Sequence, residues 1–139
     1  MDDRLKRNGM QFIKFCFVGA SGVLVNLAVF NLTLFSWDAA FGETTTAAKY
    51  LGNALGFVVS VLTNYYLNRR WTFRSSGAVA TELPKFFIVS IVAYLANLGV
   101  FTVCLQVLDF SPNLSQLVAI ACVMPINFVL NKLWSFRHA

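Results

Sequence analysis

The chain has 139 residues, of which 58% are apolar and only 12% are charged, and its formal net charge is +5. Soluble domains carry about 25% charged residues, and a soluble fold of this size leaves much of its surface in water. The composition therefore excludes an ordinary soluble domain and predicts a membrane protein. We expect no nucleic-acid partner.

Four apolar stretches follow one another along the chain. Each is close to the roughly 17–25 residues that cross a bilayer as an α-helix. Their continuous apolar character argues against strands, which alternate apolar and polar residues. The stretches cover residues 12–35, 47–67, 86–108 and 114–130. The sequence thus predicts an all-α polytopic membrane protein with four transmembrane helices.

Two prolines bear on the limits of these helices. Pro84 is expected at the start of the third helix, a position that tolerates proline. Pro125 falls inside the fourth helix, whereas Leu62 stands at the corresponding place in the second. We expect a kink in the fourth helix alone.

The basic residues are distributed unevenly between the two sides of the predicted membrane domain. Four helices place both termini and the central loop on one side, and ten of the eleven Lys and Arg residues lie there. Lys49 stands alone on the other side. The positive-inside rule assigns the basic side to the cytoplasm, so we expect both termini in the cytoplasm and the chain in the cytoplasmic membrane.

One phrase occurs twice. Residues 64–74 read NYYLNRRWTFR and residues 127–137 read NFVLNKLWSFR, with six of the eleven paired positions identical. Upstream, residues 14–30 align with 85–101 at a constant offset of 71. The chain is therefore expected to be a duplicated unit, with repeat 1 at about 12–74 and repeat 2 at about 83–137. Because each half holds two helices, the repeats should insert in the same orientation.

Polar side chains within the apolar stretches have two interpretations. Amides bond across packed helices, and they also mark substrate paths near the middle of a membrane. The repeat places them at equivalent positions in both halves, facing inward. The candidate polar path comprises Asn26, Asn64, Asn68, Asn97, Asn127 and Asn131.

Basic residues follow the asparagines directly in both halves. Membrane orientation and lipid contact explain much of this pattern. Arginine also presents a planar fork that suits phosphate, which lysine matches only as a point charge. The candidate phosphate-binding set comprises Lys14, Arg69, Arg70, Arg74, Lys85, Lys132 and Arg137.

The sequence gives little support for catalysis. His138 is the only histidine, and the cysteines Cys16, Cys104 and Cys122 have no metal-ligand spacing. No carboxylate is expected within a helix, so no buried acid–base pair is available. We expect no catalytic residue, no metal and no cofactor. The missing carboxylate also argues against a proton-driven exporter of cations.

The sequence resembles the GtrA-like family. The resemblance rests on FIKFCFVGASGVLVN at residues 12–26 and on the two N-x-x-x-N-[RK]-x-W-[ST]-F-R phrases, and it covers residues 12–137. It implies a single GtrA-like transmembrane domain over residues 1–139. It also implies a role in moving polyprenyl-phosphate-linked sugars across the cytoplasmic membrane for cell-surface polysaccharide synthesis, often beside a partner glycosyltransferase.

The polar and basic residues and the family resemblance all favour a translocator of a lipid-linked sugar. The basic residues would hold the phosphate, the asparagines would meet sugar hydroxyls, and the tail would stay in membrane lipid. A homodimer that builds the pathway between subunits fits so narrow a bundle. The alternative is a non-transporting membrane anchor or regulator of a glycosyltransferase.

The charge asymmetry gives a testable topology. Cysteines introduced at Ser76 and at Thr45 should react with impermeant reagents from opposite sides of the membrane, Ser76 from the cytoplasm. Labelling of position 76 from outside would overturn the assignment.

Overall fold

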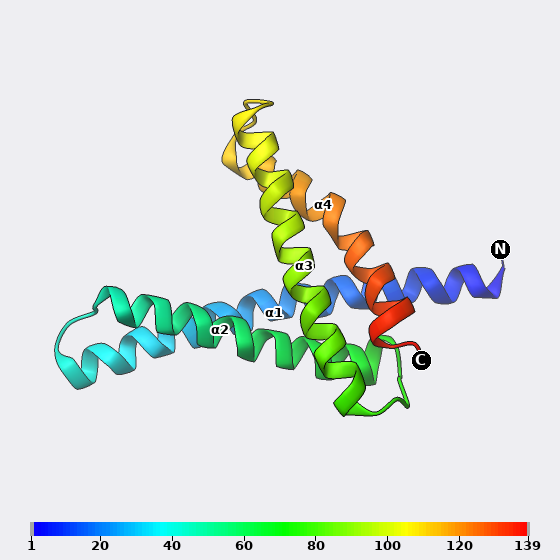
Figure 1. The fold of residues 1–139 in the computed structure, drawn as a ribbon, viewed down its shortest axis with the longest axis horizontal. Coiled ribbons are helices and arrows are strands. Elements are labelled where there is room, and N and C mark those ends of the chain that lie inside the picture. Colours follow the sequence, from blue (N-terminus) through cyan, green and yellow to red (C-terminus); the bar gives the residue numbers. More distant parts are fainter. Residues whose placement is uncertain (1, 139) are drawn as a thin grey trace. The chain divides into compact units, whose positions relative to one another are not determined.

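The apolar stretches form α-helices in the computed structural model, which describes residues 2–138 (Figure 1). The described residues contain four α-helices and two π-helical segments and no strand, which confirms the all-α prediction. In chain order the elements are α1 (Asp3–Phe41), α2 (Thr46–Leu67), η1 (Asn68–Thr72), α3 (Val79–Gln106), α4 (Pro112–Leu130) and η2 (Asn131–Ser135).

Helix α1 is much longer than the stretch predicted to cross the membrane. Its 39 residues correspond to about 58 Å at 1.5 Å per residue, roughly twice the thickness of a bilayer's hydrocarbon core. Asp3 in the first turn complements the positive end of the helix dipole. At the other end Gly42 adopts φ +77°, and its N–H bonds to the carbonyl of Asp38 at 2.7 Å. Glycine takes this left-handed conformation without strain, so the helix ends there.

The other helices begin at conventional caps or at the central loop. Thr45 Oγ1 accepts the N–H of Ala48 at the start of α2, and Ser111 Oγ accepts that of Leu114 at the start of α4. Helix α3 begins at Val79, so Pro84 lies in its second turn. The prediction that Pro84 stands at the start of this helix was therefore wrong. Helix α4 continues through Pro125 to Leu130.

The structure has the character of a membrane protein. Within the described residues, α1, α3 and the segment Pro112–Ser135 are each long and apolar enough to cross a bilayer. Many of their large apolar side chains are exposed, among them Leu24, Leu95 and Leu117, as expected for surfaces that face lipid. Helix α2 has sufficient length, but Lys49 and its asparagines lower its mean hydropathy. A fourth span therefore stays a prediction.

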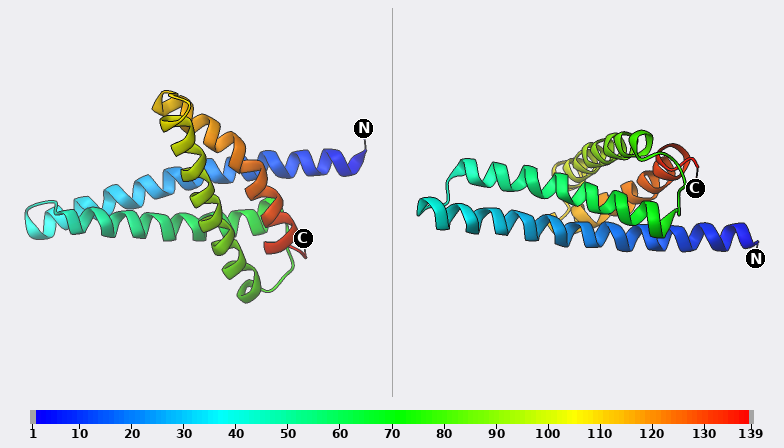
Figure 2. Two further views of the ribbon diagram at one scale, coloured as in Figure 1. Left: turned by 45° about the horizontal axis from the view of Figure 1, so that its top comes forward. Right: turned by 90° about the horizontal axis from the view of Figure 1, so that it is seen from below.

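The chain packs as two compact units. One unit is Ile13–Thr72, in which α1 and α2 run antiparallel and side by side in all three views (Figures 1 and 2). Small residues bring the two backbones close together. Ser60 Oγ donates to the carbonyl of Gly22 at 2.9 Å, and a Cβ added at Gly56 would lie 2.9 Å from the carbonyl oxygen of Asn26. Gly52 and Gly56 thus form the close-packed face that small-xxx-small spacing provides.

The other unit combines the chain up to Phe12 with the chain from Phe73 onward. Here α3 packs antiparallel against α4, and η2 also contacts α3. Four aromatic rings form the centre of this unit near the ends of the helices. Phe73 and Phe136 stack with ring centroids 4.9 Å apart, and Phe128 and Phe86 lie 5.7 Å from Phe73 and Phe136 respectively.

The tight packing of α1 on α2 predicts the effect of adding one methyl group. Gly56→Ala should lower the free energy of unfolding by about 1–3 kcal/mol, because the new Cβ would meet the backbone of α1. The thermal midpoint in detergent would measure the loss. Gly99→Ala is the matched control, since a Cβ there meets no atom within 4 Å. Alanine favours a helix over glycine by about 1 kcal/mol, so the control should be as stable as the parent or more so. Equal midpoints for the two variants would contradict the close approach.

Candidate functional site

Both copies of the repeated phrase contain a π-helical segment. Each copy continues an α-helix into five π-helical residues that begin at its second asparagine. The N–H of Asn68 reaches the carbonyls of Asn64 and Tyr65, and the N–H of Asn131 reaches those of Asn127 and Phe128. π-Helical turns are rare and often occur at functional sites. The sequence signal for them is the phrase itself, although nothing in its periodicity predicted a π-turn.

A lysine lies over a tryptophan at equivalent positions of the two copies. The Nζ of Lys14 is 5.2 Å from the ring centroid of Trp71, and that of Lys85 is 5.8 Å from Trp134. Such cation–π contacts are strongest with tryptophan. Lys14 and Lys85, both placed in the predicted phosphate-binding set, are thus each held against an aromatic ring within their own unit.

The second asparagine of each phrase is buried. Asn68 and Asn131 are 2% and 0% exposed, and the amide nitrogen of Asn131 donates to both oxygens of Asn127 at 2.9 and 3.0 Å. The Oδ1 atoms of Asn68 and Asn131 have no hydrogen-bond partner among the described residues. Both asparagines are thus buried side chains at the first position of a π-helical segment.

Two of the predicted path residues come together in the unit Ile13–Thr72. Asn26 of α1 and Asn64 of α2 line one hollow of about 270 Å³, together with Ser60. Gly22 makes room for it, because a Cβ there would collide with the amide of Asn64. Asn64 Oδ1 is buried and has no partner among the described side chains. We call this space the amide hollow; its remaining lining residues are Gly19, Gly22, Val23 and Leu27.

Asn97 and Asn127, the counterparts of Asn26 and Asn64 in the second half, do not line the amide hollow. Asn97 is half-buried on α3. Asn127 is half-buried on α4 and accepts the hydrogen bond from Asn131.

Basic residues converge in the unit that contains both ends of the chain. A hollow of about 420 Å³ lies there, and we call it the cationic hollow. Four of its eight lining residues are Lys or Arg and none is acidic. It is lined by Arg7, Gln11, Phe73, Arg74, Lys132, Leu133, Phe136 and Arg137. The sequence predicted Arg74, Lys132 and Arg137, and it missed Arg7 and Gln11.

Lys132 is the best-positioned cation of this hollow. Its Nζ donates to Asn8 Oδ1 and to Gln11 Oε1, both at 2.6 Å, and lies 5.7 Å from the centroid of Phe128. Asn8 and Gln11 are three residues apart on α1 and therefore share a face. Because both acceptors are neutral amides, they orient the ammonium group without cancelling its charge.

The repeated Phe-Arg ending of the phrase places the arginines at this hollow. Phe73 and Phe136 are buried and stacked on each other, whereas Arg74 and Arg137 directly after them are exposed. Arg74 adopts φ +50°, an uncommon value for a residue with a side chain. The stacked rings thus anchor the backbone from which both guanidinium groups extend.

Arg69 and Arg70 do not line this hollow. Both belong to the unit Ile13–Thr72, where Arg69 is half-buried and Arg70 is exposed.

Three carboxylates lie within helices, where none was expected: Asp3 and Asp38 of α1 and Glu82 of α3. Asp3 and Asp38 are exposed, whereas Glu82 is buried. Glu82 lies in the first turn of α3 and is 2% exposed. Ser75 Oγ donates to its Oε1, and Gly77 lies so close that any Cβ would collide with that oxygen. Carboxylates are favoured in the first turn of a helix, which accounts for its place. Ser75, Ser76 and Gly77 form a sequence typical of a flexible loop, yet Ser75 and Gly77 pack against Glu82.

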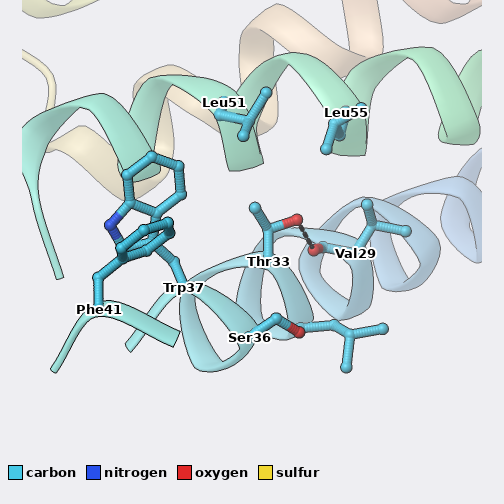
Figure 3. Close-up of a pocket in the computed structure, with 8 residues that line it drawn as sticks. Val29, Thr33, Ser36, Trp37, Phe41, Leu51 and Leu55 are labelled. Carbon is cyan, nitrogen blue, oxygen red and sulfur yellow. Dashed lines mark hydrogen bonds between the residues drawn. The ribbon is translucent and has the colours of Figure 1, made fainter. Parts of the chain in front are cut away.

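A third hollow lies between the C-terminal half of α1 and the N-terminal half of α2 (Figure 3). Leu51 and Leu55 of α2 face Val29 and Thr33 of α1 across it, and Trp37 lies at one end. The ring centroids of Trp37 and Phe41 are 4.8 Å apart, and Trp37 Nε1 is buried without a partner among the described residues. The volume is about 420 Å³, and the lining is mostly apolar.

The apolar helices and their exposed apolar surfaces define a small polytopic membrane protein. Among the described residues, no group of His, Cys, Asp or Glu side chains could hold a metal ion. The chain belongs to the GtrA/DPMS transmembrane domain family, whose pattern matches residues 14–136. It is also similar to the cell wall teichoic acid glycosylation protein GtcA of Listeria monocytogenes, with 23% identity over 131 residues. That alignment covers 90% of this chain and 83% of GtcA.

Proposed function

We propose that this protein binds a polyprenyl-phosphate-linked sugar and translocates it across the cytoplasmic membrane for the glycosylation of cell-surface polymers. Its membership of the GtrA/DPMS transmembrane domain family and its similarity to a teichoic acid glycosylation protein support a role in surface glycosylation. The protein acts in this proposal as a carrier of the lipid and performs no bond-making chemistry itself.

The cationic hollow is the observation that carries the proposal. A lipid phosphate needs a positively charged site at the depth of the head groups, with apolar surface beside it for the chain. Arg7, Arg74, Lys132 and Arg137 supply the charge, and Phe73 and Phe136 supply apolar surface at the same place. Guanidinium groups pair with two phosphate oxygens at once, which adds geometric selectivity.

The amide hollow supplies the second requirement, partners for a sugar inside the membrane. An amide offers both donors and acceptors, as sugar hydroxyls require. Asn26 and Asn64 line this hollow, and Ser60 completes its polar lining. Each polar group within the hydrocarbon region is costly unless it has a partner, so a transient sugar partner accounts for their presence.

The proposal includes the topology predicted from charge. Four spans and cytoplasmic termini put the N-terminal turns of α1, Arg74 and the segment 132–137 on the cytoplasmic side. The cationic hollow then faces the compartment in which a cytoplasmic glycosyltransferase would load the lipid. A homodimer fits the same proposal, because a pathway between two copies would enclose a larger polar head group.

An anchor or regulator of a glycosyltransferase is the second candidate. One feature favours it: the first turns of α1 expose Leu5 and Met10 beside charged residues, a surface suited to contact with another protein. Purified protein in liposomes distinguishes the two candidates. Movement of a fluorescent polyprenyl-phosphate sugar without any partner enzyme requires the translocator, whereas an anchor would move none.

Removing one cation from the hollow should weaken lipid binding. Arg7→Gln and Arg137→Gln should each reduce the affinity for a polyprenyl phosphate sugar about threefold to tenfold, since a charge-assisted hydrogen bond is lost from an exposed and partly screened side chain. Binding to protein in nanodiscs at low salt would measure the change.

The neighbouring residue offers a matched control for that experiment. Lys6→Gln removes the same charge from an adjacent, exposed position of α1 that does not line the hollow. Its affinity should stay near that of the parent. An equal loss in Lys6→Gln and Arg7→Gln would show a diffuse membrane-surface effect and would contradict a phosphate site.

The amide hollow should affect the sugar and not the phosphate. Asn26→Leu should leave the affinity for the sugar-free lipid phosphate unchanged and slow translocation of the sugar-linked lipid about tenfold, because one hydroxyl loses its partner in a low-dielectric site. Asn31→Leu is the control: Asn31 is exposed on the same helix and bonds only to the carbonyl of Leu27. Parent-like transport by both variants would exclude this hollow from the path.

A further inference from the structure

The charge of the cationic hollow exceeds what a lipid-linked sugar brings to it. Four basic side chains line the hollow and no acidic one does. A sugar joined to a lipid through one phosphate is a phosphodiester, which carries a single negative charge. The lipid phosphate without its sugar is a monoester, which carries about −1.5 to −2 at pH 7 and presents three charged acceptor oxygens.

The surroundings of Lys132 increase the excess of positive charge over the single negative charge of a phosphodiester. Asn8 and Gln11 take two of the three ammonium hydrogens and leave one for a ligand. Arg4 and Arg7 of α1 add positive charge near the same ammonium group. The carboxylate of Glu82, in the first turn of α3, accepts from Ser75 Oγ and is buried. His138 follows Arg137 in sequence and is exposed.

On the basis of the proposed function, we infer that the cationic hollow prefers the sugar-free phosphate monoester of the carrier lipid over the sugar-linked phosphodiester. The two forms of the carrier then compete for one hollow. The sugar-free form is held there by its greater charge. A protein with this preference binds the empty carrier as well as the loaded one.

Two short lipids isolate the effect of charge from that of the sugar. Farnesyl phosphate is a monoester, and methyl farnesyl phosphate is a phosphodiester of nearly the same size without a sugar. Binding of each to the full-length protein in uncharged nanodiscs should be measured at about pH 8 and about pH 5. At the higher pH the monoester should bind about tenfold more tightly, since it adds a second charge among four cations.

The pH dependence provides a signature that a structural effect would not imitate. The second proton of a phosphate monoester leaves with a pKa of about 6, so its affinity should fall severalfold as the pH drops to about 5. The diester has no proton to gain in this range and should keep its affinity. His138→Gln removes the only histidine of the chain, and it should leave the difference between the two lipids unchanged.

Substitutions assign the preference to the hollow. Lys132→Gln and, independently, Arg7→Gln should reduce the preference for the monoester at least threefold, and Lys6→Gln should preserve it. The Arg7 variant keeps the test valid if loss of the Lys132 contacts impairs folding.

The remaining outcomes separate this inference from the proposed function. Equal affinities of the two lipids at pH 8 would overturn the inference and leave the translocator intact. Failure of both lipids to bind would overturn the phosphate site and with it the proposed function. Inorganic phosphate at matched concentration should not displace farnesyl phosphate. Displacement by phosphate alone would show a site for a soluble anion and overturn the inference.

Discussion

Polar groups in hydrocarbon need partners that lipid cannot supply, and this constraint shapes the whole chain. Backbone groups satisfy it by forming helices, which is why the described residues contain no strand. Side chains satisfy it within a helix or between helices: Thr33 and Ser90 each bond to a carbonyl one turn earlier, and Ser60 of α2 bonds to the carbonyl of Gly22 in α1. The polar atoms that stay without partners, such as Asn64 Oδ1, are therefore the informative ones.

The pattern of apolar residues predicted the helices well, because an uninterrupted apolar stretch reports directly on a lipid environment. It could not predict how far α1 extends, since its first turns are polar and form a helix through contacts with other parts of the chain. Lys132 bonds to Asn8 across 124 positions of sequence, and no local pattern contains that information. The same holds for Arg7, which lines the cationic hollow and lies in the part of α1 that precedes the predicted apolar stretch.

The repeat predicted local structure more successfully than it predicted chemistry. Lys14 and Lys85 lie over equivalent tryptophans, and both phrases form π-turns, so matched residues adopt matched backbone. The matching ends where the residues differ. Gln11 and Glu82 occupy corresponding positions, three residues before Lys14 and Lys85. Gln11 is a neutral acceptor for Lys132, whereas Glu82 is a buried carboxylate tied to the central loop. The two copies of the phrase therefore share local structure, whereas the difference between Gln11 and Glu82 gives their surroundings different electrostatics.

The contrast between Gly77 and Gly42 has a practical consequence for protein engineering. A side chain at Gly77 would collide with Glu82, so the central loop is a packed element despite its serine- and glycine-rich sequence. The turn at Gly42 is exposed, and a Cβ there meets no atom within 4 Å. Loops of the second kind accept inserted sequence, whereas a packed loop does not. An affinity tag or a fluorescent reporter therefore belongs between Gly42 and Thr45, and its placement in the central loop would release a buried acid from the contacts that hold it.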